Sequence, residues 1–161
     1  MTHTFKTIDS PVGKLKLVAT GTKLTAILWE NDKPGRVRLG PMQESPQDPI
    51  LLEAARQLQE YFAGARTRFD LELEFAGTEF QKTVWQALLE IPFGQIRSYA
   101  QIAAQIGRPK AVRAVGAANG RNPLSIVAPC HRVVGTSGEL TGYAGGLRAK
   151  ELLLALEGVA N

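Results

Sequence analysis

A cysteine and a histidine that follow one another in an apolar stretch are the residues of this chain best suited to chemistry. Cys130 is the only cysteine, and His131 is one of two histidines, His3 being the other. A thiol attacks as its thiolate, which a neighbouring base or cation makes easier to form, so the pair predicts a cysteine nucleophile. The alternative interpretation is a small buried hydrophobic residue, because free cysteine is among the most buried residue types.

Residues 126–135 around this pair have the composition of a short buried strand. Isoleucine and valine flank the pair on both sides, and Pro129 interrupts the run. Successive side chains of a strand point to opposite faces, so Cys130 and His131 are not expected to touch directly. A bridging water molecule or a local bend would have to connect them.

Helical patterns dominate the chain after residue 76. Thr78 with Gln81, and Ser98 with Gln101, match the capping box that begins many helices. Apolar residues recur at helical spacing after each box and again near the C-terminus. Helices are predicted at residues 78–91, 98–106, 111–118 and 147–156.

The second and third of these helices, joined by a short turn at Gly107, fit a helix-turn-helix. One face of the third helix carries one long side chain among very small ones, namely Arg113, Gly116, Ala117 and Gly120. Each glycine in a helix costs about 1 kcal/mol relative to alanine, which favours a close approach of the backbone to another helix or to a DNA groove. On DNA, such a bare face predicts weak sequence preference.

The charge of the chain is moderately basic, with a formal net charge of +4 and a pI near 9.4. That balance is compatible with a polyanionic partner but is not specific for one. The segment from residue 97 to residue 121 holds cations and no acidic residue. In the DNA interpretation, the cations placed on phosphates are Arg108, Lys110 and Arg121.

The first half of the chain has the pattern of a β-rich scaffold. Apolar runs predict strands at residues 5–8, 14–19 and 24–29, and residues 31–47 are expected to form a loop. Asp48 is a suitable N-cap for a helix that Gly64 ends. Alternating apolar and acidic residues at 69–75 predict a half-buried strand. Nothing in residues 1–75 suggests chemistry.

Cysteine and histidine counts limit the kinds of site that this chain can build. One cysteine excludes an internal disulfide, and one cysteine with two histidines is too few for a structural zinc site. We therefore expect no metal and no cofactor. Met1 to Ser10 lacks the apolar core of a signal peptide, and no apolar run has the length of a membrane span. We expect a cytoplasmic protein with no membrane partner.

The second half of the chain resembles the O6-alkylguanine-DNA alkyltransferases, also called methylated-DNA–protein-cysteine S-methyltransferases. The resemblance rests on Pro-Cys-His-Arg-Val-Val-Gly at residues 129–135, together with residues 111–123 and 141–158. It implies an α+β fold. Residues 1–75 would form a ribonuclease-H-like β-rich domain, and residues 76–161 a mostly helical, winged-helix-like domain with a helix-turn-helix.

The same resemblance implies a reaction and the residues that carry it out. Cys130 would accept the alkyl group of O6-alkylguanine in double-stranded DNA irreversibly, with O4-alkylthymine as a secondary substrate. His131 would act through a water molecule as the base that holds Cys130 as thiolate, and Glu157 would orient His131. Asn122 would bond to the backbone around the cysteine.

The resemblance also implies which residues recognise the duplex and the damaged base, which would be rotated out of the stack. Tyr99 would donate its hydroxyl to the guanine ring, and the backbone near Val133 and Ala144 would read the base edges. Tyr143 lies in a glycine-rich loop that would form a wall for the base. Arg113 would enter the stack and fill the gap left by the flipped nucleotide.

Two other functions remain open from the residues alone. The first is a cysteine hydrolase with a triad of Cys130, His131 and Glu157. The second is a non-catalytic DNA-lesion binder. We expect a monomer in solution, and the sequence leaves open whether copies cluster on DNA.

Overall fold

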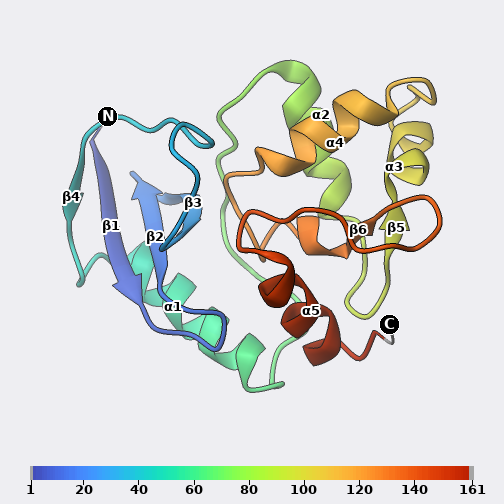
Figure 1. Ribbon diagram of the computed structural model, residues 1–161. Helices are drawn as coiled ribbons and strands as arrows, with labels where there is room; N and C mark the ends of the chain where they lie inside the picture. The colour runs from blue at the N-terminus through green and yellow to red at the C-terminus, as the bar shows by residue number, and fades with distance from the viewer. Residues whose placement is uncertain (1, 160–161) are drawn as a thin grey trace.

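A computed structural model describes residues 2–159 and places a sheet with one helix beside a group of helices (Figure 1). The sheet has the order β3-β2-β1-β4, in which β1–β2 and β2–β3 pair antiparallel and β1–β4 pair parallel. Its strands are β1 (His3–Ile8), β2 (Leu15–Thr20), β3 (Lys23–Trp29) and β4 (Met42–Glu44). The three predicted strands are confirmed, and the short β4 inside the predicted loop was missed because three residues carry no periodicity.

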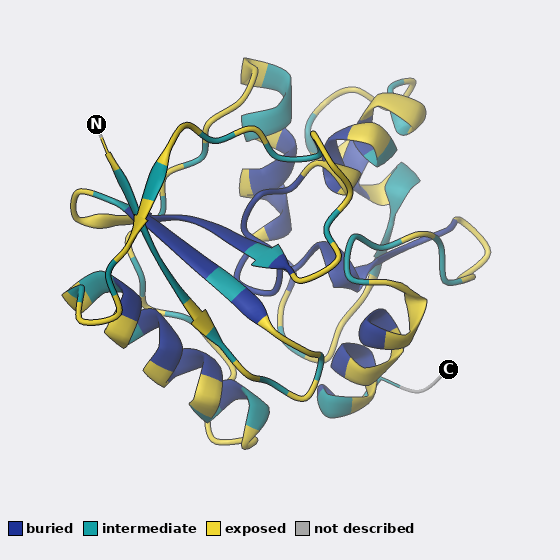
Figure 2. Cartoon of the chain, turned by 60° about the vertical axis from the view of Figure 1, so that its left-hand side comes forward, coloured by how far each residue is buried: buried dark blue, intermediate teal, exposed yellow. Residues whose placement is uncertain are grey.

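Helix α1 (Pro49–Phe62) packs its apolar face against this sheet. The side chain of Asp48 accepts a hydrogen bond from the backbone N–H of Ile50, and Gly64 beyond the helix end has a φ of +77°. Both predicted ends are therefore confirmed. Figure 2 shows β2 and β3 as largely buried strands.

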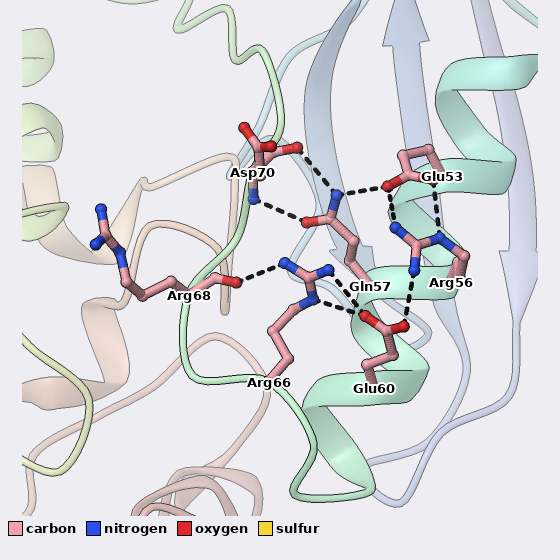
Figure 3. A network of polar contacts seen from close by, with 7 residues as sticks. All are labelled: Glu53, Arg56, Gln57, Glu60, Arg66, Arg68 and Asp70. Carbon is pink, nitrogen blue, oxygen red and sulfur yellow. Dashed lines mark hydrogen bonds and ion pairs between the residues drawn. The ribbon is translucent and has the colours of Figure 1, made fainter.

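The alternating segment 69–75 does not form the predicted paired strand. Its apolar side chains are half-buried and its acidic ones exposed, as expected, but only Leu73 forms an isolated bridge, to Leu24. At Asp70 the partner is a side chain. The amide of Gln57 donates to the carbonyl of Asp70 at 2.9 Å and accepts from its N–H at 2.8 Å (Figure 3). A helix side chain thus occupies the place of a neighbouring strand.

The second half is helical and begins with α2 (Glu79–Leu88). Both predicted capping boxes are present, at Thr78 before α2 and at Ser98 before α3. The remaining elements are β5 (Arg97–Ser98), α3 (Tyr99–Gln105), α4 (Val112–Gly120), the 3₁₀ helix η1 (Cys130–Arg132), β6 (Val133–Val134) and α5 (Leu147–Leu156). Strands β5 and β6 pair in parallel, a two-residue contact that no sequence pattern indicated.

The prediction of a strand through Cys130 is wrong. Residues 130–132 form a single 3₁₀ turn, and only Val133 and Val134 are extended in a strand. Local bonds replace the ladder, because the N–H of Cys130 donates to the carbonyl of Ala128 at 2.7 Å and Pro129 has no N–H to donate. The side chains of Cys130 and His131 therefore project from a tight bend. A local bend was one of the two arrangements that the sequence left open, the other being a bridging water molecule.

The two halves share one core at the segment that leads to the cysteine. The N–H of Ile27 in β3 donates to the carbonyl of Pro123 at 2.8 Å, and Ile27 and Leu124 form a bridge. Leu124, Ile126 and Leu153 pack in the same cluster as the sheet residues. The sheet thus anchors the backbone that precedes Cys130. Within residues 2–159, no helix has the length and apolarity needed to cross a membrane.

Candidate active site and nucleic-acid interface

Cys130 opens the 3₁₀ turn and is almost completely enclosed, with 3 % of its surface exposed. Burial raises the pKa of its thiol, and the side chain of Asn122 and the charges of Arg36 and Lys150 offset this only in part. The unliganded site therefore favours the thiol over the thiolate. Forming the nucleophile needs a base that takes its proton.

Asn122 holds the backbone that leads into the turn that carries the cysteine. Its side-chain amide donates to the carbonyl of Ala128 at 2.8 Å, and its oxygen accepts from the N–H of Leu124 at 3.0 Å. Asn122 is fully buried. Its two bonds fix the loop from α4 to Cys130, as expected from the resemblance.

His131 is fully buried, and its Nε2 lies 2.8 Å from Oε2 of Glu157. An imidazole nitrogen that faces a carboxylate carries the hydrogen, so Nδ1 holds the lone pair. Nδ1 is buried and has no hydrogen-bond partner within residues 2–159. Burial lowers the pKa of His131, although the hydrogen bond and charge of Glu157 raise it. The ring is thus a neutral base with one unoccupied acceptor.

Glu157 accepts hydrogen bonds from three residues that lie in two segments, η1 and α1. Arg132 donates through Nε to Oε1 at 2.7 Å and through Nη2 to Oε2 at 3.0 Å, and Tyr61 of α1 donates to Oε2. Burial alone would raise the pKa of Glu157, but the bonds from His131, Arg132 and Tyr61 lower it to about 2. The carboxylate is therefore a fixed anion against which His131 is oriented.

The residues expected to hold the base lie around the loop between β6 and α5. The hydroxyl of Tyr99 lies 2.5 Å from the hydroxyl of Thr141, and when Thr141 is the donor, the Tyr99 hydrogen stays free for a base. The carbonyl of Val133 accepts from the Lys150 ammonium at 2.7 Å. Ala144 is half-buried in the loop.

Tyr143 points its ring into the protein between the two halves. Its ring meets that of Trp29 edge to face, and its hydroxyl is buried without a hydrogen-bond partner among the described residues. Burial, followed by the charge of Cys130, raises the pKa of Tyr143 well above its ordinary value. A neutral phenol with a free hydrogen therefore lies close to the thiol.

Helix α4 presents the predicted bare face to solvent. Arg113, Ala117 and Gly120 are exposed, and Gly116 is half-buried. A Cβ atom at Gly120 would meet nothing within 4 Å, and one at Gly116 would meet only the Tyr99 ring, at 3.8 Å. Packing within this chain therefore does not require these glycines, which favours a groove outside the chain over a neighbouring helix.

The other predicted cations flank this face. Arg108 and Lys110 are exposed in the turn between α3 and α4, and Arg108 lies over the ring of Phe80. Arg121 is exposed just after α4, with only long bonds of 3.4 Å to the carbonyls of Gly35 and Arg36. All three can reach a polyanion without breaking an ion pair found within residues 2–159.

Residues 1–75, predicted to be a scaffold, support the site through two aromatic side chains that the sequence did not single out. Tyr61 bonds the carboxylate of Glu157, and Trp29 packs on Tyr143. Buried Arg132 and Lys150 were also missed. The available indication was weak: Tyr61 places a hydroxyl on the largely apolar face of α1, and a buried tyrosine hydroxyl usually finds a hydrogen-bond partner.

Comparisons with protein families cover both halves of the chain. Residues 79–159 match the family described as “6-O-methylguanine DNA methyltransferase, DNA binding domain”, and residues 4–75 match its “ribonuclease-like domain”. A methylated-DNA–protein-cysteine methyltransferase of Mycobacterium tuberculosis is 51% identical over 156 residues, which cover 95% of this chain and 91% of the relative. The constitutive protein of that name from Bacillus subtilis is 47% identical over 158 residues, covering 97% and 96%.

A solved structure is similar over nearly the whole chain. The crystal structure of Mycobacterium tuberculosis OGT in complex with DNA superposes with a TM-score of 0.89 at 49% identity, covering 96% of this chain and 92% of that chain. The α+β fold expected from the sequence is confirmed, with the sheet in the N-terminal half and the helices in the C-terminal half.

Proposed function

The chain belongs to the 6-O-methylguanine DNA methyltransferase family, and on that premise we propose that it repairs DNA by moving an alkyl group from O6 of guanine to its own Cys130. It is then a methylated-DNA–[protein]-cysteine S-methyltransferase. The observation that carries the proposal is the buried row of Cys130, His131 and Glu157, in which His131 keeps Nδ1 free as an acceptor.

The reaction in this site is a displacement at the alkyl carbon. The thiol proton of Cys130 passes through a water molecule to Nδ1 of His131, and the Sγ thiolate attacks the carbon bonded to O6. The S–C bond forms as the C–O bond breaks, and the electron pair of that bond stays on the base. The base then takes up one proton, which Tyr99 can deliver; Tyr99 regains a proton from solvent and His131 releases the thiol proton to solvent, so the proton lost by the thiol balances the one gained by guanine.

The product explains why each molecule acts once. A thioether is not hydrolysed by the neutral histidine beside it, so Cys130 stays alkylated. O4-alkylthymine offers the same alkyl–oxygen bond and is the secondary substrate of the proposal.

Access to the lesion requires the nucleotide to leave the duplex. The alkyl group of a stacked base cannot reach a thiol that is 3 % exposed, so the base must rotate out of the stack. In the proposal, the backbone near Val133 and Ala144, together with Tyr99 and Tyr143, receives the base. The bare face of α4 enters the groove, and Arg113 fills the gap in the stack.

The proposed partner is double-stranded DNA bearing O6-alkylguanine, bound through the α4 face and the cations Arg108, Lys110 and Arg121. The chain is proposed to act as a monomer, and clustering of copies on DNA stays a prediction.

Intact-protein mass measurement tests the proposal. After incubation with excess duplex that contains O6-methylguanine, we expect one mass increase of about 14 Da, the mass of one methylene group. Cys130→Ser, which keeps the size of the side chain, should show no increase. Repeated turnover would support the cysteine hydrolase, and tight binding with an unmodified thiol would support the lesion binder. Either result would overturn alkyl transfer to Cys130.

A further inference from the structure

Tyr61 connects the N-terminal half to the carboxylate that orients the histidine. It lies in the last turn of α1, is fully buried, and donates its hydroxyl to Oε2 of Glu157, the oxygen that also faces Nε2 of His131. Residues 61 and 157 lie in different halves of the chain. This bond therefore links a helix on the sheet directly to the proposed relay.

Three donors share this oxygen: the hydroxyl of Tyr61, Nε2 of His131 and Nη2 of Arg132. A carboxylate oxygen that accepts a hydrogen bond from a phenol has less negative charge available for a second donor. The hydroxyl of Tyr61 thus limits how strongly Glu157 attracts the N–H of His131. It also helps to fix the direction of Oε2, together with Arg132, which donates to both oxygens of the carboxylate.

The position of the Tyr61 ring is determined by aromatic packing. It meets Phe62 and Phe93 edge to face, with centroids 5.3 and 6.3 Å away, and Phe69 at a tilt with centroids 5.4 Å away. Burial, followed by the charge of Glu157, raises the pKa of Tyr61, so the phenol stays a neutral donor. A rigid donor that cannot ionise is suited to holding another group in place.

We propose that Tyr61 is a positioning residue for the alkyl transfer, through which the N-terminal half sets the strength and direction of the hydrogen bond between Glu157 and His131. The inference rests on the proposed function, because it assigns Tyr61 a role in the same relay. Tyr61 touches neither the thiol nor the base, and acts only through Glu157.

Loss of the hydroxyl has a defined direction of effect. Without Tyr61, Oε2 carries more negative charge toward His131, which stabilises the imidazolium and raises the pKa of His131. The other groups that act on this ring stay in place: Arg132 and Lys150 both lower its pKa. The pKa should therefore rise from its lowered value in Tyr61→Phe, a variant that keeps the ring and its packing.

Nuclear magnetic resonance of the histidine side chains measures this effect directly. The chain has two histidines, so His3→Gln assigns the signals of His131 by difference. Titration from about pH 5 to 8 should show that Tyr61→Phe changes the protonation constant of His131 by about threefold or more. The limb of the pH–rate profile that reports His131 should move to higher pH by the same amount.

Gln57→Leu is the matched control. Gln57 lies one turn earlier on α1, and its amide bonds Asp70 and Glu53 instead of Glu157 (Figure 3). This variant should lower thermal stability and leave the His131 titration unchanged. If Tyr61→Phe lowers stability in the same way and leaves the His131 signals at their wild-type positions, Tyr61 is only structural and the proposal is wrong.

A second substitution tests the proposal without removing the bond. Site-specific 3-fluorotyrosine at position 61 makes the hydroxyl a stronger donor and should shift the His131 signals in the opposite direction. An unchanged titration would again overturn the inference. The titrations need no DNA, so they remain decisive if the mass experiment finds no alkyl transfer.

Discussion

The indole of Trp29 in strand β3 meets the phenol of Tyr143 edge to face, with ring centroids 5.4 Å apart. Trp29 is also bonded through Nε1 to the hydroxyl of Ser125, at 3.0 Å. Through Trp29, the sheet therefore supports the loop that is expected to receive the base. Because the indole is packed and hydrogen-bonded, the loop has little freedom to move toward it.

Gly145→Ala should damage this support. A Cβ atom at Gly145 would lie 2.7 Å from atoms of the Trp29 ring, which is only 7 % exposed. We expect a loss of about 1–3 kcal/mol in the free energy of unfolding and slower alkyl transfer. Urea unfolding and single-turnover rates measure both. Gly142→Ala is the control, because its Cβ atom would meet nothing within 4 Å, and equal losses in both variants would contradict the explanation.

Glu157→Gln should be strongly destabilising as well as inactive. The substitution leaves the guanidinium of Arg132 buried without its anionic partner, and removing one partner of a buried ion pair costs about 3–5 kcal/mol. Denaturant unfolding measures the loss. Glu151→Gln removes an exposed carboxylate from α5, the helix after which Glu157 lies as the C-cap, and should change stability by less than about 0.5 kcal/mol. A Glu157→Gln variant as stable as this control would show that the pair contributes no net stability.

Stability should fall on acidification in two steps. The pKa of His131 is lowered by burial, so its contribution is present above the ordinary value of 6.5 and is lost as the pH falls below it. Glu157 has its pKa lowered to about 2, so its contribution is present above 4.5 and is lost as the pH falls toward 2. Unfolding midpoints measured against pH should show both windows, and only the lower one should remain in His131→Gln.

Arg113→Ala should separate duplex repair from the chemical step. The side chain is exposed on α4, and in the proposed mechanism it takes no part in the chemistry of the thiol. We expect a loss of about tenfold or more on duplex DNA, the rate equivalent of about 1.4 kcal/mol of unstacking energy, and almost no loss with free O6-benzylguanine. Lys23→Ala, which removes an exposed cation from the sheet, should leave both rates unchanged. Equal losses on both substrates would contradict the role in the stack.

Local patterns predicted the elements whose ends are set by neighbouring residues. Asp48, Thr78 and Ser98 marked helix starts because the capping bonds lie within three residues of them. The wrong strand predictions arose where side chains distant in the sequence, instead of a neighbouring strand, hydrogen-bond to the backbone. Segment 69–75 looks like a strand in composition, but a glutamine side chain from α1 takes its backbone bonds at one end. The turn at Cys130 was missed for a similar reason, because Asn122 holds the backbone beside it.

The candidate site was partly predictable for the same physical reason. Cys130 and His131 are adjacent and rare in the chain, so their types alone identified them. The position of Glu157 came from the resemblance, and the structure places it against His131. Tyr61 and Lys150 could not be found in this way, because a polar group on an apolar helix face does not reveal which distant atom it contacts.

The enclosure of Cys130 also bears on how long an unused molecule survives. Hydrogen peroxide and related oxidants attack exposed thiolates, and a sulfur that is 3 % exposed with a raised pKa reacts with them slowly. For a protein that acts once, capacity equals the number of intact copies, so each one lost to sulfenic acid leaves one lesion uncorrected. The burial of Cys130 thus protects the thiol from oxidation until a substrate binds, and so keeps unused molecules active.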